Sequence, residues 1–82
     1  MTTVVTVRYF AAARAATGLN EETLGAATVA ELRAEMVKRH GAGLERVLSA
    51  CGFLVDGVAC HDDLAALHGG ATVDVLPPFA GG

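Results

Sequence analysis

The chain changes its hydrophobic period twice, and this change constrains the fold more than any other feature. Residues 4–10 (VVTVRYF) alternate apolar and polar side chains as a β-strand does, and residues 72–76 (TVDVL) do the same near the other end. Between these segments, Val29, Leu32 and Met36 recur at the spacing of one helix face. Two strands on either side of a helix in sequence predict a sheet with that helix packed on one face.

The side chains of these two strands should divide between the two faces of the sheet. The inward positions hold Val5, Val7, Tyr9, Val73 and Val75. The outward positions hold Thr6, Arg8, Phe10, Thr72, Asp74 and Leu76. Phe10 and Leu76 are therefore apolar residues on a face where polar side chains are expected.

The ends of the main helix are marked by capping residues. Thr28 and Glu31 fit a capping box, in which each side chain accepts a hydrogen bond from a free amide of the first turn. Gly41 supplies the stop, and Glu35 is expected to pair with Arg39 one turn further on. A helix from residue 29 to about residue 40 follows.

Shorter elements fill the remaining segments. Residues 11–17 (AAARAAT) have strong helix propensity before Gly18, and residues 22–26 should form a brief strand beside the first one. A second amphipathic helical segment should end at Gly52, with its apolar positions at Leu44, Val47, Leu48 and Cys51. It is expected to pack without any chemical role.

Asp56-Gly57 lies between two apolar triplets and predicts a tight hairpin, because both residues tolerate positive φ. Residues 61–67 resemble a polar start followed by one helical turn, and Gly69-Gly70 a loop. Together the elements predict an α+β fold, with a mixed sheet of about five strands and one main helix on one face. This is the β-grasp arrangement of ubiquitin-like proteins, formed by residues 1–76 and followed by a tail of residues 77–82.

Composition narrows the function. A chain of 82 residues forms one small domain, and a net charge of −3 provides no field for holding nucleic acid. No apolar run approaches the roughly 18 residues of a membrane span, so a soluble, cytoplasmic protein is expected. Cys51 and Cys60 should be reduced and packed as small apolar groups. The histidines are scattered, and no metal site is expected.

The C-terminal residues suggest chemistry at the chain end. Pro77 and Pro78 fix φ and favour an extended course away from the sheet. Phe79 and Ala80 follow, and Gly81-Gly82 carry no side chains. Such an end could enter a narrow channel in a partner, where the terminal carboxylate is open to attack.

These motifs together resemble the MoaD/ThiS family of ubiquitin-like sulfur carriers, which includes the small subunit of molybdopterin synthase. The resemblance rests on Tyr9-Phe10-Ala11 with Arg14, on Val55-Asp56-Gly57, on Gly69-Gly70 and on the ending Pro77-Pro78-Phe79-Ala80-Gly81-Gly82. It covers nearly the whole chain. It implies the β-grasp fold and a working end at Gly81 and Gly82.

The resemblance also implies a mechanism and partners. A ubiquitin-activating-like adenylyltransferase would use ATP and magnesium to adenylate Gly82, and a persulfide would deliver sulfur to give a thiocarboxylate. The large subunit of molybdopterin synthase, in a heterotetramer, would then receive the tail, and the sulfur would pass to cyclic pyranopterin monophosphate. The chain would be a non-catalytic, sulfur-carrying subunit with no bound cofactor.

The family further implies a partner interface. Positions matching Phe10 and Leu76 belong to a hydrophobic interface, beside Pro77, Pro78, Phe79 and Ala80 of the tail. A third family position falls on Ala59, which is smaller than usual, and the outward Leu54 could compensate. Arg14 matches an arginine near the partner surface or is a solvated helix charge. Solvated faces, or complements to a basic partner, are expected at Glu21, Glu22, Asp62 and Asp63.

Other readings remain open at this stage. The chain could carry sulfur for thiazole, cysteine or another product, or it could be a ubiquitin-like modifier that joins Gly82 to lysines of other proteins. It could also be an interaction module with no role for its terminal glycines. The sequence offers no pair of a nucleophile and a base that would indicate an independent enzyme.

Overall fold

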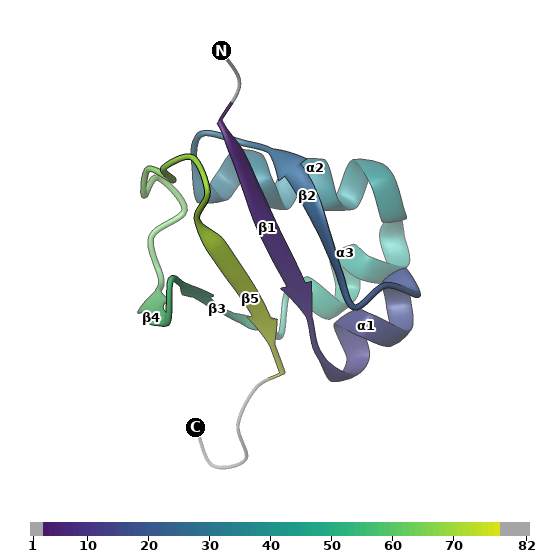
Figure 1. Ribbon diagram of the computed structural model, residues 1–82. Coiled ribbons are helices and arrows are strands. Elements are labelled where there is room, and N and C mark those ends of the chain that lie inside the picture. The colour runs from purple at the N-terminus through teal and green to yellow at the C-terminus, as the bar shows by residue number, and fades with distance from the viewer. Residues whose placement is uncertain (1–2, 78–82) are drawn as a thin grey trace.

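The computed structural model describes residues 3–77, which form five strands and three helices (Figure 1). In chain order they are β1 (Val4–Tyr9), α1 (Ala11–Thr17), β2 (Glu21–Gly25), α2 (Val29–His40), α3 (Ala42–Leu48), β3 (Gly52–Val55), β4 (Val58–Cys60) and β5 (Thr72–Leu76). The strand and helix types predicted for these segments are confirmed. The boundaries differ from the predictions by a few residues.

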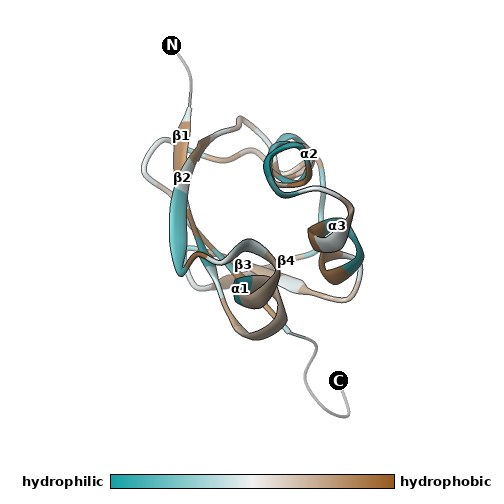
Figure 2. Cartoon of the chain, turned by 90° about the vertical axis from the view of Figure 1, so that its right-hand side faces the viewer, coloured by the Kyte–Doolittle hydropathy of each residue, from teal (hydrophilic) through white to brown (hydrophobic). Residues whose placement is uncertain are grey.

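The five strands form one mixed sheet in the order β2-β1-β5-β3-β4. The β1 and β5 strands pair in parallel at its centre, and the other neighbours are antiparallel. Seen from the side in Figure 2, α2 and α3 lie opposite β1 and β2 as a second layer. The predicted β-grasp arrangement is therefore confirmed, with two short helices beside the main one.

The capping signals act largely as expected. Gly18 ends α1 with φ 74°, and its amide donates to the carbonyl of Arg14. Thr28 Oγ1 accepts the amide of Glu31 at 3.2 Å, so it caps α2. Glu31 Oε1 accepts the amide of Ala27, one residue before the cap, at 3.0 Å. The chain enters α2 with both of these amides satisfied.

Three local predictions were wrong. Glu35 lies 3.9 Å from Lys38 and not beside Arg39, because Arg39 turns toward Glu22 at 3.8 Å. The α3 helix ends at Leu48, where the amides of Ala50 and Cys51 bond to carbonyls only three residues earlier, and Gly52 begins β3.

The third error concerns residues 61–67, which form turns and no helix. Asp62 Oδ1 accepts the amide of Leu64, a local bond that competes with helix formation. The carbonyls of Asp63 and Ala65 instead accept the amides of Ala30 and Val29. This loop therefore satisfies the first free amides of α2.

The core lies between the sheet and the helices. Every inward strand position predicted from the alternation is at most 1% exposed, namely Val5, Val7, Tyr9, Val73 and Val75. The helices contribute Ala13, Val29, Leu32, Met36, Leu44 and Leu48. Cys51 and Cys60 are half-buried and pack against this core, as predicted for small apolar groups. Among the described residues, no helix has the length and apolar character that a membrane crossing requires.

Candidate functional site

The candidate site begins where β5 ends. The β5 strand lies between β1 and β3, so the residues that follow Leu76 leave the sheet at its centre. Pro77 is half-buried at this point. The predictions for Pro78, Phe79, Ala80, Gly81 and Gly82 concern residues outside the described range. The structure therefore defines the root of the tail.

Strand register places three apolar residues around this root. Tyr9 pairs with Val75, so Phe10 and Leu76 follow as neighbours at the ends of β1 and β5. Leu54 pairs with Asp74, two positions before Leu76. All three side chains take the predicted outward positions, and all three are half-buried. We call Phe10, Leu54, Leu76 and Pro77 the root patch.

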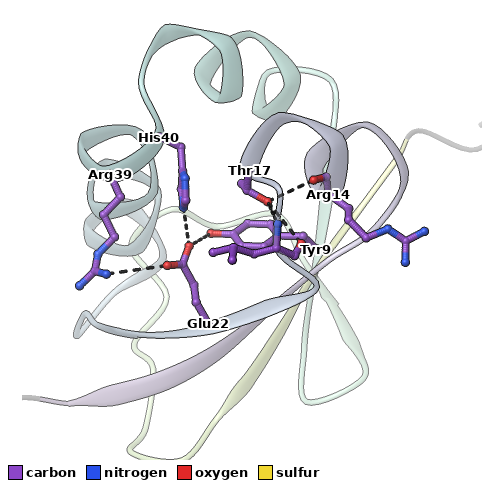
Figure 3. Close-up of polar contacts among 7 residues, drawn as sticks. Tyr9, Arg14, Thr17, Glu22, Arg39 and His40 are labelled. Atoms are coloured by element: carbon purple, nitrogen blue, oxygen red, sulfur yellow. Dashed lines mark hydrogen bonds and ion pairs between the residues drawn. The ribbon is translucent and has the colours of Figure 1, made fainter.

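The two remaining interface predictions fall at different places. Ala59 is exposed and pairs directly with Leu54 across β3 and β4, so the larger leucine lies beside the small residue. Arg14 is exposed on α1, and its guanidinium is 3.5 Å from Asn20 Oδ1. Figure 3 shows the Arg14 side chain pointing away from the domain. Leu54 therefore extends the root patch, while Arg14 lies apart on the helix.

The sequence reasoning missed an ion pair on the outer face of the sheet. Arg8 Nε and Nη2 donate to the two carboxylate oxygens of Asp74 at 2.7 and 3.1 Å. The Arg8 guanidinium also lies 5.6 Å from the centre of the Phe10 ring. Both residues were predicted to face outward, and their charges would have indicated the pair once β1 and β5 were known to be neighbours. The pair borders the root patch and makes the outer face of the sheet polar at its centre.

A second polar cluster lies on the inner side of the sheet (Figure 3). The Tyr9 hydroxyl donates to Glu22 Oε2 at 2.6 Å, and His40 Nε2 lies 2.6 Å from the same oxygen. Arg39 approaches the other Glu22 oxygen at 3.8 Å. Glu22 was predicted to be solvated, but its side chain is only 12% exposed. It was missed because β2 brings it against α2, and that contact is not encoded locally.

The two ionisable groups at the centre of this cluster titrate away from their ordinary ranges. Burial, followed by the hydrogen bond to Glu22, raises the pKa of Tyr9. Burial alone would raise the pKa of Glu22, but the hydrogen bonds from Tyr9 and His40 outweigh it and lower that pKa. The cluster therefore holds Glu22 ionised and joins β1, β2 and α2.

A further pair joins the hairpin turn to the loop before β5. His68 Nε2 lies 2.6 Å from Asp56 Oδ2, and His68 Nδ1 lies 3.0 Å from the carbonyl oxygen of Gly69. Asp56 Oδ1 accepts the amide of Thr72 at 2.9 Å. The hydrogen bond to Asp56, and then the one to Gly69, raise the pKa of His68. Each ring nitrogen of His68 lies beside an acceptor, and this arrangement favours the imidazolium form, in which both nitrogens carry a proton.

The sequence and fold match known proteins. A model of the ThiS family matches residues 7–82. A chain from Pyrococcus furiosus, described as molybdopterin converting factor subunit 1, is 28% identical; the match covers 95% of this chain and all of that one, with a TM-score of 0.79. None of the curated proteins matches significantly.

Two further solved structures share the fold. A complex of subunits 1 and 2 of molybdopterin-converting factor from Helicobacter pylori contains a chain with 25% identity and a TM-score of 0.77; the match covers 98% of this chain and 100% of that one. Small archaeal modifier protein 1 from Methanosarcina acetivorans has 20% identity and a TM-score of 0.86, over 100% and 99% of the two chains. This last likeness shows the ubiquitin-like fold alone.

Proposed function

The chain belongs to the ThiS family, and from this premise we propose that it is a sulfur carrier that works through a thiocarboxylate at Gly82. The observation that carries the proposal is the root patch at the end of β5, together with a family match that extends to Gly82. A half-buried apolar surface around the start of a tail suits a protein that docks while its end reaches into a partner.

The proposed chemistry takes place at the chain end. An adenylyltransferase uses ATP and magnesium to form an acyl-adenylate at Gly82. A persulfide then attacks the acyl carbon as AMP leaves, and a thiol cleaves the S–S bond of the resulting acyl disulfide, which releases the thiocarboxylate and a disulfide. Gly81 and Gly82 have no side chains and can pass a narrow channel. The carrier supplies the carboxyl group and the docking surface, while its partners supply the catalytic groups. Because the reaction consumes ATP, we place it in the cytoplasm.

The preferred acceptor is cyclic pyranopterin monophosphate bound to the large subunit of molybdopterin synthase. The complex of two molybdopterin-converting factor subunits from Helicobacter pylori supports this partner. We propose that Phe10, Leu54 and Leu76 contact the partner, with Pro77 directing the tail. Ala59, beside Leu54, lies at the edge of this contact, and Arg14 would reach the partner only from α1. A carrier for thiazole or cysteine synthesis, or a protein modifier, would use the same activation with a different acceptor.

Intact-protein mass spectrometry tests the carrier. The tag-free chain is incubated with an adenylyltransferase, ATP and a sulfide source, and the expected product is heavier by one oxygen-to-sulfur exchange. The deletion of Gly82 should show no gain, with unchanged thermal unfolding. Addition of the large subunit and the pterin precursor should then remove the sulfur. No mass gain with an enzyme that is active on its own carrier would contradict the proposal, and a gain that the pterin does not discharge would favour another acceptor.

The docking surface is tested separately by affinity for the large subunit. Phe10→Ser and Leu76→Ser should each weaken binding at least about tenfold, or about 1.4 kcal/mol, because apolar anchors at an interface centre carry most of its energy. Leu64→Ser is the matched control, since Leu64 is 80% exposed in the loop between β4 and β5. Equal affinities for the three variants would exclude the root patch as the docking surface.

A further inference from the structure

Lys38 is the only lysine in the sequence, and the other five basic side chains are arginines. It lies in the last turn of α2 with 80% of its side chain exposed, 3.9 Å from Glu35. An exposed ion pair at this distance holds a side chain weakly. A lysine amine can be acylated once it loses its proton, whereas arginine keeps its proton and forms no such amide under the same conditions. Lys38 is therefore the single side-chain amine available to an activated carboxyl group.

Lys38 borders a groove between α2 and α3 of about 570 Å³. Its apolar lining is formed by Ala30, Ala34, Val37 and Leu48. Its charged lining is formed by Arg33, Lys38 and Glu45. On the other side of Lys38 lies a smaller hollow of about 270 Å³, which contains Glu31 and Glu35. The amine thus lies between two hollows, only one of which has a mainly apolar lining.

The dimensions of this groove match the residues that follow Pro77. From Ala30 to Lys38 the helix rises about 12 Å, and five extended residues span at most about 17 Å. Residues 78–82 include one large apolar side chain, Phe79, and end in two residues without side chains. A phenylalanine ring suits an apolar lining, and residues without side chains can approach an amine closely.

We propose that the groove binds residues 78–82 of a second copy of this chain, and that Lys38 is the acceptor to which activated Gly82 of that copy is joined. The inference rests on the proposed activation of Gly82. The deprotonated Lys38 Nζ attacks the Gly82 carbonyl carbon and a C–N bond forms. The bond from that carbon to the adenylate oxygen breaks, AMP leaves, and the remaining amine proton passes to solvent. The product is an isopeptide-linked dimer.

The arrangement of the fold favours a second copy over the chain's own tail. In Figure 1, α2 crosses at the end of the sheet where the N-terminus lies, whereas β5 ends at the opposite end. Lys38, in the last turn of α2, therefore lies on the side of the groove away from the tail root, whereas Leu48 lies closer in the chain to Gly52, the partner of Leu76. One copy can present its tail while its own groove receives another, so the contact is head-to-tail and can extend beyond two copies.

The test installs the activated group chemically, so that it does not depend on an adenylyltransferase. The full chain carrying a C-terminal thioester is incubated at mildly alkaline pH, and its products are resolved by intact mass and peptide sequencing. The expected product is a dimer linked from Gly82 to Lys38. Lys38→Arg should lower the dimer yield at least about tenfold, because it removes the amine that the groove positions.

Two variants separate a positioned amine from a merely reactive one. Lys38→Arg combined with Arg46→Lys moves the single lysine to an exposed α3 position outside the groove, and its yield should stay as low as that of Lys38→Arg. Ala34→Gln keeps Lys38 but fills the groove at an exposed helix position, and should also lower the yield.

Several outcomes would overturn the inference: no dimer from the thioester, linkage through the α-amine, a cyclised monomer as the main product, or equal yield from the relocated lysine. Each of these results leaves the proposed function intact, because adenylation plays no part in the experiment. Failure of enzymatic adenylation, in turn, would appear only in the carrier assay.

Discussion

The two faces of the central sheet are made by alternate residues of the same strands, yet they differ in nearly every property. On the inner face of β1 and β5, Val5, Val7, Val73 and Val75 are at most 1% exposed. On the outer face, the Arg8 and Asp74 side chains form an ion pair beside the half-buried Phe10 and Leu76. One face is covered by helices, whereas the other remains partly exposed.

This difference separates the residues that stabilise the domain from the residues of the proposed docking surface. A substitution on the inner face removes contacts inside a close-packed core. A substitution on the outer face changes half-exposed groups and leaves that packing intact. The following predictions test how complete this separation is.

The largest effect is expected from neighbouring residues of β2 that face opposite sides. Leu24→Ala should lower the free energy of unfolding by about 2–5 kcal/mol, because it leaves a cavity where a fully buried side chain was. Thr23→Ala, at an exposed position, should change it by less than about 0.5 kcal/mol. Urea unfolding of both variants measures the contrast. Similar losses would show that the outer face is also part of the packed structure.

Loss of the inner polar cluster should lower the free energy of unfolding by less than Leu24→Ala does. The contribution of this cluster should also depend on pH in the acid range. Glu22→Ala leaves the Tyr9 hydroxyl and His40 without their acceptor and should cost about 1–3 kcal/mol. The folded state lowers the Glu22 pKa below its ordinary value of 4.5, so acid favours the unfolded state. The stabilisation is present above pH 4.5 and is lost as the pH falls through the folded pKa.

Glu22→Gln is the control for this acid dependence, since it keeps an acceptor oxygen and cannot titrate. Urea midpoints measured from neutral to acid pH should fall more steeply for the wild type than for Glu22→Gln. Parallel curves would mean that Glu22 does not couple folding to pH.

A smaller effect of opposite sign is expected at the start of α1, beside the root patch. Ala11 has φ 50°, a left-handed conformation that costs a non-glycine residue about 1–2 kcal/mol. Ala11→Gly should therefore stabilise the fold by about 0.5 kcal/mol, after the greater freedom of glycine in the unfolded chain is subtracted. Ala12→Gly in the same helix should destabilise it by about 0.5–1 kcal/mol. Thermal unfolding compares them, and losses of equal size would show that Ala11 is unstrained.

The smallest effect should come from the exposed pair of His68 and Asp56. The folded state raises the His68 pKa above its ordinary 6.5, so the pair contributes below that pH and its contribution is lost as the pH rises through the folded pKa. NMR titration should show the His68 pKa falling toward its ordinary value in Asp56→Asn. Asparagine also tolerates the φ of 50° at this turn. An unchanged His68 pKa would mean that the pair does not form in solution.

Local sequence patterns predicted most of the fold. The alternation of β1 and β5, the Thr28 cap and the Asp56-Gly57 turn are each set by residues close in sequence. The turns at residues 61–67 were misread as helix because their carbonyls bond to the start of α2, which lies more than thirty residues earlier. Such bonds cannot be seen in a local window.

The candidate site, too, could be predicted only where it depends on residues close in sequence. Phe10 and Leu76 could be predicted as outward apolar residues from alternation alone, and register then placed them together. The burial of Glu22 and the pair of Arg8 with Asp74 depend on which strands and helices become neighbours. The charge of each residue was visible in the sequence, but its partner was not.

The position of β5 has a consequence for how the molecule is made. It comes last of the five strands in sequence order, yet it occupies the middle of the sheet, where it alone joins β1 to β3. The two halves of the sheet cannot unite during synthesis until β5 has been added, and the contacts that unite them are distant in sequence. A chain that stops before Leu76 lacks both the strand that completes the fold and every residue of the tail. The sheet is thus completed only by the segment that directly precedes the tail.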